Sequence, residues 1–357
     1  MNNKRIFLDV HAIQTVPPSN INRDDTGSPK TAQYGGTTRA RVSSQAWKRA
    51  MRQYFYANSE QTNIGVRTLD IVRYVADQMK KIDTGKSDEE AMKRAEDAIN
   101  AAGIKTKEQK ARALFFLGQK QAERLAQAAL DGLNDKKQLQ QILQDNPALD
   151  IALFGRMVAD DPSLNEDASA QVAHAISTHS VQTEFDFYTA VDDLQKEDNA
   201  GAGMLGTIEF NASTLYRYAN VAVHALSDQL QDKDAVIGSL CLFVEAFANA
   251  MPTGKANTFA NQTLPQALLV SIRTDRPVNL VSAFEEPVRS RDGYGKESIQ
   301  KLLAEYEKVE KFVAKPALTL VLRLDGNEED GQKGLVVQSL GELLDQLRTG
   351  LNKQLQE

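Results

Sequence analysis

The sequence predicts an α+β fold whose sheet-forming chain is interrupted near its start by a large helical block. Residues 5–14 alternate between apolar and polar, which is typical of a half-buried strand. Apolar runs over 267–273 and 317–324 predict further strands. From about residue 64 to residue 144, apolar residues instead recur at helical spacing. Strands that flank a run of helices indicate the α+β class.

The composition is that of a soluble globular protein rather than a membrane or disulfide-rich one. Of the 357 residues, 41% are hydrophobic and 25% are charged, and no apolar run approaches the ~20 residues of a membrane span. This length suffices for one large domain or two ordinary ones. Cys241 is the only cysteine, so a disulfide within the chain is impossible. Since the N-terminus does not resemble a signal peptide, a reducing cytoplasm is expected.

Proline, glycine and serine positions define the elements of the first sixty residues. The prolines at 17–18 are expected to end the first strand. Residues 21–38 are rich in Gly, Asn, Asp and Thr, which predicts a loop. Ser43 or Ser44 is a suitable N-cap for a helix that runs to about Asn58.

The helical block is expected to contain several helices, because its apolar positions form three separate stripes. Gly85, Gly103 and Asn134 are expected to divide one helix from the next. The stripes are Leu69, Val72, Val75, Ala76 and Met79, then Ala91, Met92, Ala95, Ala98 and Ile99, and then Leu114, Leu117, Leu125 and Ala128.

The second half of the chain predicts a long hairpin followed by alternating helices and strands. Strand-like runs over 183–191 and 207–218 flank the polar, glycine-rich stretch DDLQKEDNAGAGMLG, which predicts a flexible hairpin tip. Helices are expected over 235–251, 296–311 and 339–351.

Positive charge is concentrated in one segment of an otherwise acidic chain. The 42 Lys and Arg residues against 48 Asp and Glu give a net charge of −6. The window from Thr26 to Ser59 contains no Asp or Glu, so the remaining 36 cations and 48 anions carry −12. Such segregation indicates that one surface meets an anion. The cations of the window are Lys30, Arg39, Arg41, Lys48, Arg49 and Arg52.

The helix predicted after Ser44 divides into an apolar face and a cationic face. Ser43 and Ser44 would present hydroxyls and free backbone amides at its N-terminus, where an anion is favoured. A polyphosphate backbone is the partner that this arrangement favours, and an ordinary solvated helix face is the open alternative. The apolar face is Trp47, Ala50, Met51, Tyr54 and Phe55. The cationic, hydrogen-bonding face is Gln45, Lys48, Arg49 and Arg52.

At these residues the sequence also resembles a known family. INRDD at 21–25 and YGGTTRARVSSQAWKRAMR from Tyr34 closely resemble the repeated backbone subunit of the type I-E CRISPR surveillance complex, Cascade (the CasC family). The resemblance spans most of the chain and is weakest in the helical block and after about Pro252. It continues through DIALFGRM (150–157), AHAISTH (173–179), FYTAVDDL (187–194) and LGTIEF…LYRYANV (205–221).

The resemblance implies an RNA-recognition-motif-like (ferredoxin-like) palm with a helical finger insertion and a β-hairpin thumb. Residues 1–60 would form the first part of the palm, with the basic RNA-binding helix, and residues 223–357 the second part. Residues 61–180 would form the finger and residues 181–222 the thumb.

The resemblance also implies a function in antiviral defence. Several copies would polymerise head to tail along a CRISPR guide RNA (crRNA), and each thumb would kink the RNA at intervals so that it pairs with target DNA. Other Cascade subunits would complete the ribonucleoprotein, and a separate helicase–nuclease would be recruited to destroy the DNA. The subunit itself is not expected to be an enzyme or to need a cofactor or metal.

Matching positions in the family motifs imply roles for particular residues. Met157 would pack against RNA bases near the kink, and Thr189 and Leu205 of the thumb would do similar work. Further nucleic-acid contacts are expected at Arg23, Arg39, Arg41 and Arg156. The positions that match backbone-gripping residues are Lys30, Ser43, Gln45, Lys48, Arg49 and Arg52.

Two other functions stand as alternatives. Backbone subunits of the related type III complexes cut RNA with a loop aspartate, so the first is a metal-dependent ribonuclease that uses Asp25. The second is a helical scaffold without nucleic acid, which would leave the charge segregation unexplained. His174 and His179 lie five residues apart, whereas a metal pair on a helix prefers four, so core or capping histidines are expected there.

Overall fold

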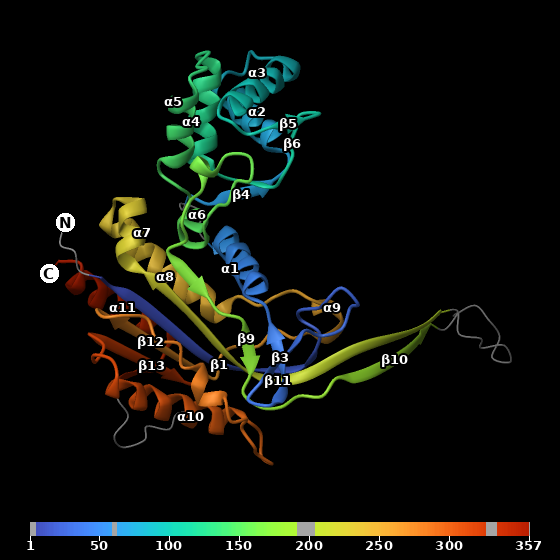
Figure 1. Ribbon diagram of the computed structural model, residues 1–357, viewed down its shortest axis with the longest axis vertical. Helices are drawn as coiled ribbons and strands as arrows, with labels where there is room; N and C mark the ends of the chain where they lie inside the picture. The colour runs from blue at the N-terminus through green and yellow to red at the C-terminus, as the bar shows by residue number, and fades with distance from the viewer. Residues whose placement is uncertain (1–4, 59–62, 191–203, 326–333, 357) are drawn as a thin grey trace. The chain divides into compact units, whose positions relative to one another are not determined.

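The computed structural model describes residues 5–58, 63–190, 204–325 and 334–356, and the chain divides into two compact units (Figure 1). Each unit is assembled from segments far apart in the sequence. The first unit comprises Met1–Tyr54, Val172–Asn220 and Cys241–Glu357. The second unit comprises Phe55–Gln171 and Val221–Leu240.

The first unit is built on a mixed β-sheet. Its strands are β1 (Phe7–Ser19), β2 (Thr31–Tyr34), β3 (Thr37–Val42), β9 (Ala175–Ser177), β10 (Glu184–Ala190), β11 (Met204–Ala222), β12 (Ala267–Arg273), β13 (Leu318–Arg323) and β14 (Leu335–Val337). Within the described residues they follow the order β14-β13-β12-β1-β11-β9-β3-β2, and β10 pairs with β11. Strand β12 is antiparallel to β1 and β13, whereas β14 runs parallel to β13. Strands and helices together confirm the predicted α+β class.

The predicted helices of this unit are confirmed to within three residues at either end. Helix α1 runs from Ser44 to Asn58, so Ser43 is the N-cap of the two serines that the sequence offered. No helix in the described part of the chain is long and apolar enough to cross a membrane. The remaining helices are α8 (Lys233–Asn249), α9 (Ala256–Phe259), α10 (Gly295–Lys308) and α11 (Leu340–Gln354), with 3-10 turns η3 (Val281–Phe284) and η4 (Val309–Lys311).

Strand β1 is longer and more deeply buried than the sequence predicted. It continues through both prolines to Ser19. Its polar residues Asp9, His11 and Gln14 are as buried as the apolar residues between them. The reason is that α10 packs on the face that carries Asp9 and His11, whereas Gln14 on the other face contacts Met251 and Arg217, so β1 has no solvent face. In β1, apolar and polar residues alternate along the sequence, but buried and exposed residues do not.

The prediction of one loop over residues 21–38 was wrong in its second half, where β2 and β3 form a hairpin. Tyr34 pairs with Thr37, so only Gly35 and Gly36 form the turn. Their φ angles are +58° and +75°, the left-handed values of a two-residue hairpin turn. Strand β2 is at the sheet edge, which explains its polar composition.

The second unit is mainly helical, with short strand pairs that the sequence did not predict. Strand β4 pairs with β7, and β5 pairs with β6. The three predicted stripes form its core, except that Leu69 and Leu114 are exposed. Its elements are β4 (Gly65–Thr68), α2 (Ile71–Ile82), α3 (Asp88–Ala101), β5 (Thr106–Lys107), β6 (Lys110–Ala111), β7 (Phe115–Gly118), α4 (Gln119–Leu130), α5 (Lys136–Gln144), α6 (Leu149–Phe154), η1 (Pro162–Leu164), β8 (Ala170–Val172) and α7 (Val223–Leu230).

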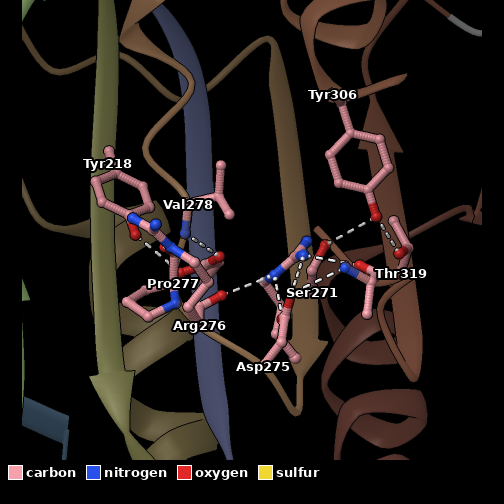
Figure 2. A network of polar contacts seen from close by, with 11 residues as sticks. Tyr218, Ser271, Asp275, Arg276, Pro277, Val278, Tyr306 and Thr319 are labelled. Atoms are coloured by element: carbon pink, nitrogen blue, oxygen red, sulfur yellow. Dashed lines mark hydrogen bonds and ion pairs between the residues drawn. The ribbon is translucent and has the colours of Figure 1, made fainter. Parts of the chain in front are cut away.

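Buried polar groups join β1 to the segment that follows β12. Asp9 accepts hydrogen bonds from Tyr218 Oη at 2.9 Å and from the Val278 amide at 3.0 Å. Arg273, the last residue of β12, pairs with Asp275 of this segment at 3.2 Å. Figure 2 shows Tyr218, Asp275 and Val278 within the same network of contacts. Burial of Asp9 raises its pKa from 3.8 to about 7, which outweighs the hydrogen bonds that favour its ionised form.

The folded protein therefore binds a proton at Asp9 that the unfolded chain releases. This contribution to stability is complete below pH 3.8 and is lost as pH rises through about 7. We expect Asp9→Asn, which resembles the protonated side chain, to remove this dependence. Urea unfolding of both proteins across this range measures it, and the free energy of wild type should fall relative to the variant as pH rises. A pH-independent difference between the two would contradict the shifted pKa.

Candidate nucleic-acid interface

Helix α1 has the two faces that the sequence predicted. Trp47, Met51 and Phe55 are buried, with at most 1% of each side chain exposed. On the opposite face, Gln45 and Arg49 are exposed. Lys48 and Arg52 on the same polar face are half-buried, and burial lowers the pKa of Lys48. The helix thus presents an amide and guanidinium stripe to solvent while its apolar face is held in the core.

The N-terminal amides of α1 are less free than the sequence suggested. The Ser43 hydroxyl accepts a bond from the Ala46 amide at 3.3 Å, and its carbonyl accepts from Trp47. The Ser44 amide donates to His174 Nδ1 at 3.2 Å. Ser43 itself is buried, with 6% exposed. Anion binding at this helix end therefore depends on side-chain charge more than on open backbone donors.

Two cations and a histidine gather at the same helix end. The Arg41 amide donates to the Lys30 carbonyl at 2.9 Å, which places the two residues side by side across neighbouring segments. Burial lowers the pKa of His174, and the nearby charges of Arg41 and Lys30 lower it further. The Arg41 guanidinium also donates to the Thr31 carbonyl at 3.2 Å. The neutral form of His174 can cap α1 while Lys30 and Arg41 supply positive charge.

An open groove of about 750 Å³ runs along α1. It brings together four of the predicted residues: Arg23, Ser43, Gln45 and Arg49. Lys30, Lys48 and Arg52 are not among its lining residues. The sequence missed the other polar groups of the groove, because they come from separate loops and from the next helical turn. Those groups are Asn22, Thr26, Gln53, Thr253 and Gly254. The groove is also lined by the carboxylates of Asp24 and Asp25.

The loop over residues 21–27 is a rigid wall of this groove. Asp24 Oδ1 accepts bonds from the Thr26 amide, the Thr26 hydroxyl and the Ser28 amide, at 2.8–3.0 Å. The Thr26 hydroxyl and these amides lower the pKa of Asp24. Asn20 adds bonds to the Gly27 and Glu209 carbonyls, both at 2.9 Å. Asp24 thus shapes the loop, and Arg23 is held exposed beside it.

The opposite wall approaches this loop too closely for any side chain at Gly254. A Cβ there would lie 2.3 Å from the Ile21 carbonyl oxygen and 3.0 Å from that of Asn20. The backbone at Gly254 therefore packs directly on residues 20–21. This contact fixes the distance between two walls whose residues lie more than two hundred positions apart in the sequence.

Arg39 and Arg156 lie in the interior, which corrects the expectation that they contact a nucleic acid. Arg39 has no exposed surface, and 4% of Arg156 is exposed. Burial lowers the pKa of Arg156 to about 10, so it remains charged at neutral pH. Arg39 donates to the Thr37 hydroxyl and to the carbonyls of Tyr34, Ser177, Phe284 and Glu285. Arg156 donates to Gln121 and to the carbonyls of Phe116, Leu143 and Leu164.

Arg156 and a glycine turn hold Met157 in solvent. Helix α6 ends at Phe154 and is followed by Gly155, whose φ is +78° and where a Cβ would lie 2.9 Å from the Glu166 carbonyl oxygen. Arg156 exchanges two backbone bonds with Glu166, at 3.0 and 2.8 Å. Met157 is nevertheless 87% exposed, and the next residue, Val158, is buried again. Since Arg156 is fixed by these bonds and Val158 by burial, the backbone at Met157 has a defined position and its side chain is exposed on the second unit.

The β10–β11 hairpin pairs as predicted and projects from the sheet (Figure 1). Thr189 is exposed. The backbone of Leu205 pairs with Thr189, whereas its side chain and the predicted tip over 191–203 lie outside the described residues. Phe185 and Phe187, which share the face of Thr189, are 67% and 64% exposed. The alternating sequence pattern predicted that the two aromatic side chains lie on one strand face, but it did not predict that this face is exposed.

Both histidines of the AHAISTH motif have structural partners, as the sequence predicted. His174 caps α1, as described above. His179 Nδ1 donates to the Ser180 carbonyl at 2.9 Å, and its Nε2 accepts from the Thr214 amide at 3.1 Å. Burial lowers the pKa of His179, and its ring stacks on Tyr294. Within the described residues, no group of three or more His, Cys, Asp or Glu is placed to hold a metal ion.

Comparisons with known proteins give one consistent result. A family profile described as CT1975-like protein matches residues 8–346. A chain of a solved "CRISPR RNA-guided surveillance complex, pre-nicking" is 32% identical, with a TM-score of 0.86 over 97% of this chain and 100% of that one. A chain of a second "CRISPR RNA-guided surveillance complex" is 28% identical, with a TM-score of 0.76 over 96% and 99%. A search of curated proteins returned no match.

The close contact at Gly254 predicts a steric effect on the groove. We expect Gly254→Ala to lower the free energy of unfolding by about 1–3 kcal/mol, because the added methyl forces the two walls apart. Gly238→Ala is the matched control, since no atom lies within 4 Å of a Cβ there and alanine favours a helix. Denaturant unfolding compares the two variants. Equal stability would contradict the fixed spacing of the walls.

Proposed function

The chain belongs to the family of CT1975-like proteins, and from that premise we propose that it is the guide-RNA-binding backbone subunit of a type I-E CRISPR Cascade complex. Its likeness to chains of CRISPR surveillance complexes, over nearly all of its length, supports this assignment and makes a crRNA and other Cascade subunits its partners. The observation that carries the RNA-binding part is the groove along α1. There the longest segment without acidic residues, Thr26–Ser59, supplies Ser43, Gln45 and Arg49 to a surface of an acidic protein. Of the two carboxylates that also line the groove, Asp24 is engaged by its own loop and Asp25 lies at the rim.

The groove is suited to phosphate rather than to base edges. Arg23 and Arg49 supply exposed guanidinium groups, and Gln45, Asn22 and Thr253 supply neutral hydrogen-bonding groups. Contacts of this kind position a nucleic acid without reading its sequence. A subunit that carries arbitrary guides needs this property, since base pairing with the guide supplies the specificity. We assign Lys30, Arg41, Lys48 and Arg52 to the same backbone, beyond the groove itself.

We assign the kinking of the RNA to apolar groups outside the groove. Met157 is exposed on a rigid turn, and Thr189 and Phe187 are exposed on the hairpin. Side chains of this type can unstack a base or cover an exposed one. In this proposal the hairpin is the thumb, the second unit corresponds to the finger, and the sheet is the RNA-recognition-like palm. Copies would then assemble head to tail, each one kinking the RNA once.

The subunit would act by binding alone, in the cytoplasm. The guide would pair with target DNA, and a recruited helicase–nuclease would cut it. The alternative of a metal-dependent ribonuclease is not supported. Asp24 is engaged in the turn of its own loop, and Asp25 lies exposed at the rim of the groove.

The decisive experiment is to purify the chain with and without a co-expressed CRISPR array and to sequence the retained RNA. Repeat-derived guides in an oligomer are expected, and an RNA-free protein in the presence of array and partner subunits would overturn the proposal.

Arg49 provides a direct test of phosphate binding. We expect Arg49→Ala to weaken the binding of every RNA sequence alike, and to reduce the slope of log affinity against log salt by about one. Arg291→Ala, an exposed arginine outside the groove, is the matched control and should change neither quantity. Fluorescence anisotropy with two unrelated RNAs at several salt concentrations gives both numbers. A loss confined to one RNA would contradict backbone recognition.

Met157 provides a separate test of kinking. We expect Met157→Ala to leave the salt dependence unchanged, because the thioether carries no charge. It should instead lower the contrast between reactive and protected nucleotides when the bound guide is probed chemically. Wild-type complexes are expected to show reactive positions at regular intervals. An unchanged probing pattern in the variant would show that Met157 does not shape the RNA.

A further inference from the structure

Arg217 of β11 is a fully buried cation between two aromatic rings. Its side chain is 1% exposed. The guanidinium carbon lies 3.6 Å from the centre of the Trp47 ring and 4.4 Å from that of Phe247. One guanidinium nitrogen donates to Gln14 Oε1 and another to the Phe247 carbonyl. The Nε group has no acceptor among the described protein atoms.

No carboxylate among the described residues neutralises this charge. The contrast is Arg273, which is equally buried and pairs with Asp275. Burial lowers the pKa of Arg217 to about 9, so it remains protonated at neutral pH. Charged groups inside proteins are ordinarily paired, because an unpaired charge there is costly. The two rings offset part of that cost through cation–π attraction, but they carry no net negative charge.

The position of Arg217 relates this charge to the groove. Trp47, which stacks on it, lies on the buried face of α1, whose other face carries Gln45 and Arg49. Gln14, which accepts its bond, also contacts Met251, and the next residue lines the opposite wall. Trp47 and Met251 belong to one apolar cluster together with Ile21 and Ala46, which line the groove. The cation therefore lies behind the groove in a region of low dielectric constant.

We propose that the buried charge of Arg217 attracts the RNA backbone electrostatically, without a direct contact. The phosphates in the groove supply the counter-charge that the protein interior lacks. This inference rests on the proposed function and deepens it, because it names a residue outside the groove that contributes to RNA affinity. Its field passes through apolar side chains, where it is weakened less than in water. The charge also favours RNA-bound over RNA-free protein, since only the complex neutralises it.

The first test separates charge from contact. Full-length wild type, Arg217→Met and Arg49→Ala are titrated with a labelled single-stranded RNA at several salt concentrations. We expect Arg217→Met to bind about tenfold more weakly, with an unchanged slope of log affinity against log salt, because no phosphate contact is lost. Arg49→Ala should reduce the slope. Arg217→Lys should keep most of the affinity at neutral pH, because it keeps the charge.

The second test separates charge from packing. Phe247→Leu removes one ring of the sandwich and keeps the guanidinium, so its RNA affinity should match wild type. Thermal unfolding provides a further measurement. Without RNA, Arg217→Met should be at least as stable as wild type, because an unpaired buried charge is removed. With saturating RNA, wild type should gain more in melting temperature than the variant.

Two results would overturn the inference. The first is a folded Arg217→Met protein that binds RNA as tightly as wild type and gains the same stabilisation from it. The second is an equal loss of affinity in Phe247→Leu and Arg217→Met, which would assign the effect to packing. Both leave the proposed function intact, since wild type and Arg49→Ala would still differ. Failure of wild type itself to bind RNA would instead remove the proposed function together with this inference.

Discussion

Helix α1 can present cations to solvent only because its opposite face is fixed in the core. Trp47 and Met51 are buried side by side on that face, and Trp47 stacks on Arg217 of the sheet. Without packing of its apolar face, the helix would have no fixed orientation, and its polar face would have no defined position. The groove, its two loop walls and the cluster at Lys30 and Arg41 all take their positions from this packing. The interface is therefore a property of the sheet as much as of the basic helix.

Arginine has two distinct uses in this chain. Arg23 and Arg49 are exposed at the groove, whereas Arg39 and Arg156 are buried and bonded to backbone carbonyls. A guanidinium offers five donors in a fixed fork, so it can join several loops that have no other partner for their carbonyls. Arg156 does this directly beside Met157, and so holds an apolar side chain where water would otherwise disfavour it. Removing such a buried arginine is expected to displace the loops that it joins, and to change RNA affinity only as a consequence of that displacement.

Buried polarity extends through the first unit beyond its arginines. Asp9 and Tyr218 form a hydrogen bond within the sheet, and His11 lies 3.0 Å from the Tyr216 hydroxyl. Tyr306 connects Ser271 to Thr319 in the neighbouring strands (Figure 2). Hydrogen bonds of this kind are directional, so they specify one register between strands that apolar packing alone would allow to slide.

The sequence by itself determined the α+β class, the helix at Ser44–Asn58 with its two faces, and the hairpin. All three follow from local periodicity and turn residues, and the absence of acidic residues in one window adds the cationic character of the helix face. Tertiary structure decided which cations are available. Arg39 and Arg49 are equivalent in a charge count, but Arg39 is buried on β3 and Arg49 is exposed on α1. It also decided the second wall of the groove, because Gly254 packs on Ile21, more than two hundred positions away in the sequence. Burial and long-range contact depend on how distant segments pack, and no local pattern contains that information.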